Sequence, residues 1–359
     1  MKIILLFVHI SLCIIIPKVS VILPSYNVKK YIHQCLESAR NQTLKQLEFI
    51  IVDCGSNDGT LSVINDFVSS DSRFRLINSE IKSYGYQMNL GIKAARGQYI
   101  GIIETDDFVD SNMYQKLYDL AQTHNFPDVV KSEFNYVKKN NTEITKSSIY
   151  TNTYNSVFNF KQYPYLILEH PSLWSGIYRR DFLNTNNIEF LESPGASFQD
   201  TGFYLKIFYL ASTVFTTPLT FYYYRTDNPG SSVHNKQKVF AIVNEFKAFE
   251  LFIDRFPELK RYWRKYYLAK KTRSYCWNYE RISKQFRDAF IKRIRNEFTY
   301  DMVYEAKSIL PKRHLKFLRR VLSTKRKSAN FIFATLLYLF IVLFCFSLLF
   351  NLSSYRIRF

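Results

Sequence analysis

Apolar and polar positions follow two alternating periodicities along residues 19–103. Short runs that are apolar throughout predict β-strands, and they lie at residues 19–23, 48–52, 74–77 and 99–103. The stretches between them carry apolar residues at helical spacing, at residues 28–40, 59–69 and 84–95. Strands of this kind, separated by helices, predict an α/β fold with a Rossmann-like, mostly parallel sheet that helices cover on both faces.

Polar turns follow three of the predicted strands, at residues 24–27, 53–59 and 104–107. Right-handed crossovers place the carboxyl ends of parallel strands at one edge of the sheet, where open α/β sheets bind ligands. We therefore expect the three turns to meet in one site. The chain contains neither the GxGxxG pattern of dinucleotide-binding folds nor the GxxxxGK[ST] pattern of P-loops.

Three acids, Glu104, Asp106 and Asp107, follow the last of these predicted strands. Acids are poor strand formers, so their concentration at a strand end indicates a binding or catalytic site. A simpler interpretation is that Asp110 or Ser111 caps the next helix and the acids only face water. The local pattern leaves both interpretations open.

The rest of the chain falls into segments of different composition. Residues 126–165 are irregular, and beyond them the pattern predicts a helix at 203–211 and strands at 213–217 and 219–225. The predicted organisation is a hydrophobic N-terminal segment (1–17), an α/β domain (18–235), a basic helical membrane-proximal region (236–328), a transmembrane helix (329–350) and a short tail (351–359).

The formal charge of +19 is concentrated in one region. Residues 255–327 hold 23 Lys/Arg and 6 Asp/Glu, which gives 23 − 6 = +17. Both nucleic acid and anionic lipid attract such a surface, and we expect membrane lipids and no nucleic acid, because the uncharged 22-residue segment 329–350 follows and is long enough to span a bilayer. The heavier positive flank on its N-terminal side places the α/β domain in the cytoplasm. Residues 3–16 are also apolar but shorter than the about 20 residues of a spanning helix, which leaves single-pass and two-pass arrangements open.

Three motifs in fixed order carry a resemblance to a known family: VSVILPSYN, ESARNQTLKQLEFIIVDCGSNDGT and AARGQYIGIIETDD. Over residues 18–235 the chain resembles the family 2 glycosyltransferases, and its later segments are similar to those of bacterial surface-polysaccharide enzymes. The resemblance implies the GT-A fold and transfer of a sugar from a nucleotide-sugar donor, with a UDP-sugar as the expected donor. The implied acceptor is a glycan or a lipid-linked hydroxyl, and the implied outcome is inversion at the anomeric carbon.

The resemblance also assigns roles to individual acids. Asp107, the last Asp of the motif, would bind a Mn²⁺ or Mg²⁺ ion, and Asp106 would contact the donor and belong to the same metal site. Oxygen ligands suit both ions, and the cation would act as a Lewis acid on the leaving diphosphate. Asp200 corresponds to the base that accepts the proton of the acceptor hydroxyl. From its local sequence alone, Asp200 could instead be the N-cap of the following helix.

Donor contacts are implied for four further residues, Pro24, Tyr26, Asp53 and Arg225. The turn at residues 228–232 is a second candidate for phosphate, because backbone N–H groups in such turns can bind anions. Two departures from the family pattern concern this region. Cys54 stands where many members have a second Asp that touches the base, and residues 85–89 lack an Arg that is common there. The specificity for uridine therefore stays open.

Other functions compete with this interpretation. A processive polysaccharide synthase is disfavoured because the chain has no Q-x-x-R-W motif and no array of spanning segments. A glycosidase also uses paired carboxylates, but it does not need nucleotide-binding turns. The alternative from a different class is a non-catalytic glycan-binding or scaffold protein on a degenerate glycosyltransferase fold, supported by Cys54 and Met88. We favour a metal-dependent, inverting, non-processive glycosyltransferase.

Overall fold

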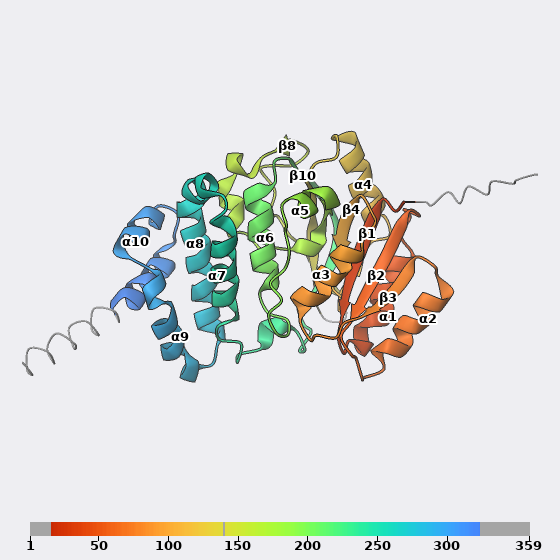
Figure 1. Ribbon diagram of the computed structural model, residues 1–359, viewed down its shortest axis with the longest axis horizontal. Helices are drawn as coiled ribbons and strands as arrows, with labels where there is room; N and C mark the ends of the chain where they lie inside the picture. The colour runs from red at the N-terminus through yellow and green to blue at the C-terminus, as the bar shows by residue number, and fades with distance from the viewer. Residues whose placement is uncertain (1–15, 139–140, 324–359) are drawn as a thin grey trace, which may run out of the picture. The chain divides into compact units, whose positions relative to one another are not determined.

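The computed structural model, shown in Figure 1, describes residues 16–138 and 141–323. The chain divides into two compact units, Met1–His234 with Glu245–Leu259 and Asn235–Asn244 with Lys260–Phe359, and each is described by itself. The predicted transmembrane helix and tail lie outside the described residues, as does nearly all of the N-terminal segment, so these assignments stay predictions. Among the residues that the structure describes, no helix combines the length and apolar character of a membrane span.

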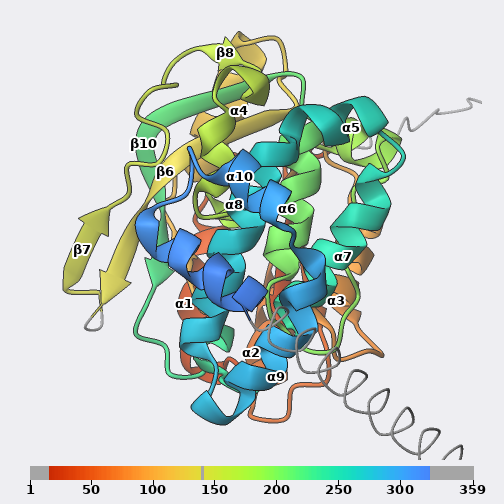
Figure 2. The same ribbon diagram turned by 90° about the vertical axis from the view of Figure 1, so that its left-hand side faces the viewer.

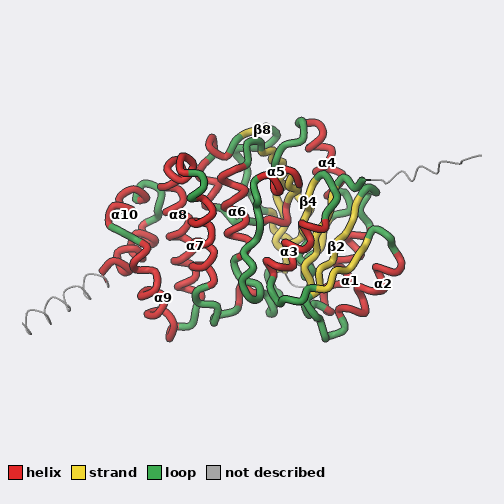
Figure 3. Tube along the Cα trace, viewed as in Figure 1, coloured by secondary structure: helices red, strands yellow, loops and turns green. Residues whose placement is uncertain are grey.

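The first unit is built on a mixed sheet with the strand order β3-β2-β1-β4-β9-β6-β10-β5. Its parallel part consists of the strands that the apolar runs predict, as Figure 3 shows: β1 (Val19–Ser25), β2 (Leu47–Asp53), β3 (Phe74–Asn78) and β4 (Tyr99–Ile102). Each of these strands except β3 is buried along its whole length. Burial on both faces explains why their sequences are apolar throughout rather than alternating.

The remaining strands make the sheet less parallel than the sequence predicts. β9 (Gly176–Arg179) runs antiparallel to both β4 and β6 (Val129–Lys138), and β5 (Phe108–Val109) runs antiparallel to β10 (Val214–Arg225). The predicted strands 213–217 and 219–225 form the single strand β10, whose pairing with β6 is irregular between Thr217 and Tyr222. Two short strands complete the sheet in antiparallel pairs, β7 (Glu143–Lys146) beside β6, as Figure 2 shows, and β8 (Val157–Phe158) beside β10.

Helices cover both faces of the parallel part. On one face α3 (Tyr84–Ala94) approaches β1 so closely that a Cβ on Gly91 would lie 2.5 Å from the side chain of Ile22. On the opposite face α4 (Met113–Thr123) places Tyr114 against Gly101, where a Cβ would lie 2.6 Å from the ring. The two faces are opposite because Gly101 pairs with the residue before Ile22, and neighbouring residues of a strand point to opposite sides.

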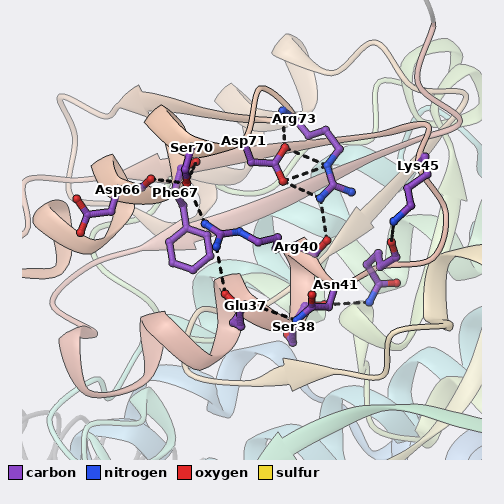
Figure 4. A network of polar contacts seen from close by, with 11 residues as sticks. Glu37, Ser38, Arg40, Asn41, Lys45, Asp66, Phe67, Ser70, Asp71 and Arg73 are labelled. Atoms are coloured by element: carbon purple, nitrogen blue, oxygen red, sulfur yellow. Dashed lines mark hydrogen bonds and ion pairs between the residues drawn. The ribbon is translucent and has the colours of Figure 1, made fainter.

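A polar network ties α1 (Lys29–Arg40) to α2 (Thr60–Ser70) and β3 on the outside of the sheet (Figure 4). Arg73 pairs with Asp71 at 2.7 Å and donates to the backbone oxygen of Arg40 at 2.7 Å. The Arg40 guanidinium lies 4.0 Å from the centroid of the Phe67 ring and donates to Ser70 at 3.0 Å. Because these groups are partly exposed, the network mainly fixes the helices against each other.

Further helices complete the first unit and form the second. α6 (Gln199–Leu210) precedes β10, and the part of α7 (Ala241–Ile253) from Glu245 onward belongs to the first unit. The short helix α5 (Arg180–Thr185) follows β9. The second unit is helical, as the sequence predicts, with most of α8 (Pro257–Arg281), all of α9 (Arg287–Ile294) and α10 (Tyr300–Ala306). Its interior holds the ion pair of Lys271 and Glu297, 2.8 Å apart.

Candidate functional site

The three polar turns meet at the carboxyl edge of the parallel strands, as predicted. The backbone N–H of Asn27, after β1, donates to the hydroxyl of Ser56, after β2, at 2.8 Å. The hydroxyl of Thr105, after β4, donates to the backbone oxygen of Pro24 at 2.7 Å. Parallel pairing brings these residues together because it places all three strand ends at the same edge.

Asp107 is the most enclosed of the predicted site residues, with a side chain that is 0% exposed. Its Oδ2 accepts from the hydroxyl of Tyr222 at 2.9 Å, and its Oδ1 accepts from the backbone N–H of Arg225 at 2.8 Å. Burial, together with the negative charge of Asp106, raises the pKa of Asp107 well above its usual range. The N-terminal part of the chain thus supplies the acid, and β10 supplies the groups that hold it.

Asp106 is partly exposed, and residues at and after the end of β10 hold it in place. Its Oδ2 accepts from the side-chain amide of Asn228 at 2.7 Å, and its backbone oxygen accepts from the guanidinium of Arg225. Arg225 also donates to the side chain of Gln34 on α1. Both terminal nitrogens of Arg225 are therefore committed to the protein, and its predicted contact with the donor stays a prediction.

Glu104, the first acid of the loop, accepts a hydrogen bond from the hydroxyl of Tyr84 at 2.7 Å. Burial raises the pKa of Glu104 to about 8, a rise that the hydrogen bond from Tyr84 opposes and the charges of Asp106 and Asp200 increase. A carboxyl group with this pKa carries a proton at neutral pH. Glu104 therefore adds a hydrogen-bonding group to the site and little negative charge.

Asp200 lies in the first turn of α6, near the acid loop. Its charge contributes to the raised pKa values of both Glu104 and Tyr84, so Asp200 lies within electrostatic range of the acid loop although it is distant in sequence. Its Oδ1 accepts from the adjacent backbone N–H of Thr201 at 2.7 Å, while the N-cap position belongs to Phe198. The structure thus brings the predicted base to the mouth of β4.

The other predicted donor contacts lie on the neighbouring turns. The carboxylate of Asp53 is used within its own turn, where it accepts from the backbone of Gly55 at 2.9 Å and of Ser56 at 2.8 Å. Tyr26 is 36% exposed, and the Lys82 ammonium lies 3.6 Å from the centroid of its ring. Tyr26 is thus an exposed side chain at this edge of the sheet, and its contact with the donor stays a prediction.

The chemistry of the acids fits a divalent cation. Asp106 and Asp107 offer hard carboxylate oxygens side by side, and no Lys or Arg side chain forms an ion pair with either one in the part of the chain that the structure describes. Two neighbouring acids without such compensation attract a cation. In that same part no group of three His, Cys, Asp or Glu side chains forms a ready-made metal site, so donor phosphates would have to complete the coordination.

Sequence reasoning missed the residues that hold the acids. Tyr222, Asn228 and Tyr84 each donate to a carboxylate of the loop. Tyr84 opens a helix and Tyr222 lies in a run of three tyrosines, so no local signal distinguishes either from an ordinary packing residue. Asn228 lies in a predicted turn, where Asn is common for conformational reasons alone.

Comparisons with known proteins agree with this architecture. The family model described as Glycosyl transferase family 2 matches residues 20–185. The uncharacterized glycosyltransferase EpsJ of Bacillus subtilis is 28% identical over 321 residues, which cover 85% of this chain and 90% of EpsJ. The putative glycosyltransferase EpsH of the same organism is 30% identical over 214 residues, which cover 58% of this chain and 61% of EpsH.

A solved structure has the same fold. The structure of residues 1–349 of TarS from S. aureus, in complex with UDP-GlcNAc, superposes with a TM-score of 0.63 at 18% identity and covers 87% of this chain and 92% of the TarS chain. Family match, relatives and fold agree with the sequence motifs. Residues 20–185 therefore carry a glycosyl transferase family 2 domain, and the chain is a glycosyltransferase that uses a nucleotide-sugar donor.

Proposed function

We propose that this enzyme transfers a sugar from a UDP-sugar to a hydroxyl of a glycan or lipid-linked acceptor, with inversion and with the help of Mn²⁺ or Mg²⁺. The observation that carries the proposal is the convergence of Asp106, Asp107 and Asp200 at the carboxyl edge of the sheet. The presence of UDP-GlcNAc in the TarS structure supports a UDP-sugar as the first donor to test.

In the proposed mechanism two groups of acids divide the work. Asp106 and Asp107 would hold the cation, which supplies Lewis-acid stabilisation for the departing diphosphate when it is bound. Asp200 accepts the proton of the acceptor hydroxyl as its oxygen attacks the anomeric carbon, which gives inversion in a single displacement.

We also propose that the enzyme works at a membrane with its catalytic unit in the cytoplasm, and that it adds one sugar per encounter. The basic character of residues 255–327 and the apolar segment at 329–350 support this location. Fractionation of cells that express the full chain, with and without residues 329–350, tests it. Recovery of the full chain in the soluble fraction contradicts the membrane assignment.

The activity is tested with a panel of nucleotide sugars and Mn²⁺, with released nucleotide as the readout. Asp107→Ala and Asp200→Ala should each abolish turnover while the proteins remain folded. Asp66→Ala, an exposed acid on α2, is the matched control and should behave as wild type. NMR of the product with a synthetic acceptor reports the anomeric configuration. Turnover that survives both substitutions, or a product with retained configuration, refutes the mechanism.

A further inference from the structure

Asn228, in the turn after β10, is an unexpected partner of the acid loop. Its side chain is 8% exposed, and its amide nitrogen donates to Oδ2 of Asp106 at 2.7 Å. The two residues lie 122 positions apart in the sequence. Oδ1, the other carboxylate oxygen of Asp106, accepts no hydrogen bond within residues 16–138 and 141–323.

The surroundings of Asn228 determine which way its amide points. Its side-chain oxygen accepts from the backbone N–H of Gly230 at 2.9 Å and from the hydroxyl of Tyr31 on α1 at 3.3 Å. The backbone N–H of Gly230 can only donate, so the oxygen must face it and the nitrogen must face Asp106.

The same turn has little free backbone for a phosphate. The N–H of Gly230 is taken by the Asn228 side chain, and the N–H of Ser231 donates to the backbone oxygen of Asn228 at 3.1 Å. The N–H of His234 donates to the backbone oxygen of Ser231 at 3.0 Å. The contact that this turn offers to the site is therefore a side chain, and it reaches the acid that is expected to meet the donor.

We propose that Asn228 is a positioning residue for Asp106: its amide holds one carboxylate oxygen and leaves the other oxygen turned toward the donor and its metal ion. The inference rests on the proposed function of Asp106 and adds the group that sets its orientation. If the carboxylate of Asp106 could rotate freely, donor binding would have to fix its orientation, and that loss of conformational entropy would weaken binding. Asn228 makes that orientation part of the folded enzyme.

The competing explanation is that Asn228 only stabilises its own turn. Asn228→Asp separates the two roles, because an Asp side chain keeps the oxygens that accept from Gly230 and Tyr31 but replaces the donor to Asp106 with a second negative oxygen. A role in the turn alone predicts wild-type behaviour. A positioning role predicts that Asp106 is pushed away by the new carboxylate.

The experiment uses the full chain with Asn228→Asp and Asn228→Ala. Asn159→Asp is the matched control. Its oxygen, like that of Asn228, accepts from the backbone N–H two residues further on, Lys161 at 2.9 Å, but its amide donates only to backbone oxygens, of Ala211 at 3.3 Å and of Ser212 at 3.1 Å. We expect kcat/KM for the donor to fall by about 10- to 100-fold in both Asn228 variants, the loss typical of a hydrogen bond to a charged group. Thermal stabilisation by UDP with Mn²⁺ should shrink in parallel, while Asn159→Asp keeps both values.

Two failures are distinguishable. If the wild type turns over a donor and is stabilised by UDP with Mn²⁺, but Asn228→Asp matches it in both measurements, the positioning role is refuted and the proposed function stands. If Asn228→Ala lowers the unfolding temperature without ligand, Asn228→Asp keeps it, and neither variant changes kcat/KM, the residue serves the turn only. If the wild type neither turns over nor binds any nucleotide sugar, the proposed function and this inference fall together.

Discussion

Replacing Glu245 by Gln should change how the stability of this enzyme depends on pH. Glu245 lies on α7 and is 1% exposed, and among the described residues neither of its carboxyl oxygens has a hydrogen-bond partner. Its Oε2 is so close to α6 that a Cβ on Gly202 would lie 2.3 Å away. Burial and, to a lesser extent, the charge of Asp200 raise the pKa of Glu245 to about 9, against the opposing effect of the Lys206 charge.

The sign and size of the effect follow from linkage. An unfolded Glu has a pKa of about 4.3, so between about pH 5 and pH 8 the unfolded chain releases this proton and the folded enzyme keeps it. The free energy of unfolding is therefore highest at low pH, where both states bind this proton, and it falls as the pH rises toward 9. The loss is about 1.4 kcal/mol per pH unit, or about 4 kcal/mol over this range, as an upper estimate for one group.

Gln has nearly the same shape and no proton to lose. Compared with wild type, Glu245→Gln should become steadily more stable from pH 5 to pH 8 by up to about 4 kcal/mol. Urea denaturation at four pH values measures the difference, and Glu80→Gln, an exposed site after β3, should give a difference that does not vary with pH. Parallel stability curves for wild type and Glu245→Gln would show that the carboxyl group is ionised in the folded enzyme and refute the reasoning.

Three further changes test the packing around the site. Tyr222→Phe removes the hydroxyl that donates to the buried Asp107, and it should cost about 1–3 kcal/mol in urea denaturation and lower kcat/KM; unchanged stability contradicts the hydrogen bond. Gly202→Ala places a methyl group against Glu245 and should cost about 1–3 kcal/mol, and Glu245→Ala should relieve most of that cost in a double-mutant cycle. Arg225→Lys keeps the positive charge but loses the planar guanidinium that donates to both Asp106 and Gln34. We expect kcat/KM for the donor to fall about tenfold or more, with an unchanged KM for the acceptor. Wild-type kinetics would show that the guanidinium is dispensable.

The parallel half of the sheet could be predicted from the sequence because each of its signals is local. A buried parallel strand is a contiguous apolar run, and a strand-to-helix turn is a contiguous polar one, so β1, β2 and β4 are visible in single windows. The acids after β4 stand out for the same reason. Parallel pairing of β1, β2 and β4 then brings these acids to the turns after β1 and β2, and no further sequence motif is needed to predict it.

The antiparallel half depends on contacts that no local window contains. β9 has four residues and β5 has two, too few for a periodicity to be recognised. Tyr222 and Asp107 are 115 positions apart, and a tyrosine that holds an acid looks in sequence like one that fills a core. The raised pKa of Glu245 likewise arises from its packing against Gly202, a glycine that the sequence presents as an ordinary helical residue.

The catalytic unit divides near residue 185 between the acid loop and the groups that hold two of its acids. The family model ends at residue 185, and the acid loop lies within it. The groups that orient Asp106 and Asp107 lie beyond that limit, on β10 and the turn that contains Asn228, as does Asp200 on α6. In the proposed mechanism, the acids that activate the donor and the groups that position them are therefore carried by different parts of the chain. Substitutions after residue 185 can alter the orientation of Asp106 without touching the motif, so two enzymes with the same acids need not bind the same donor equally well.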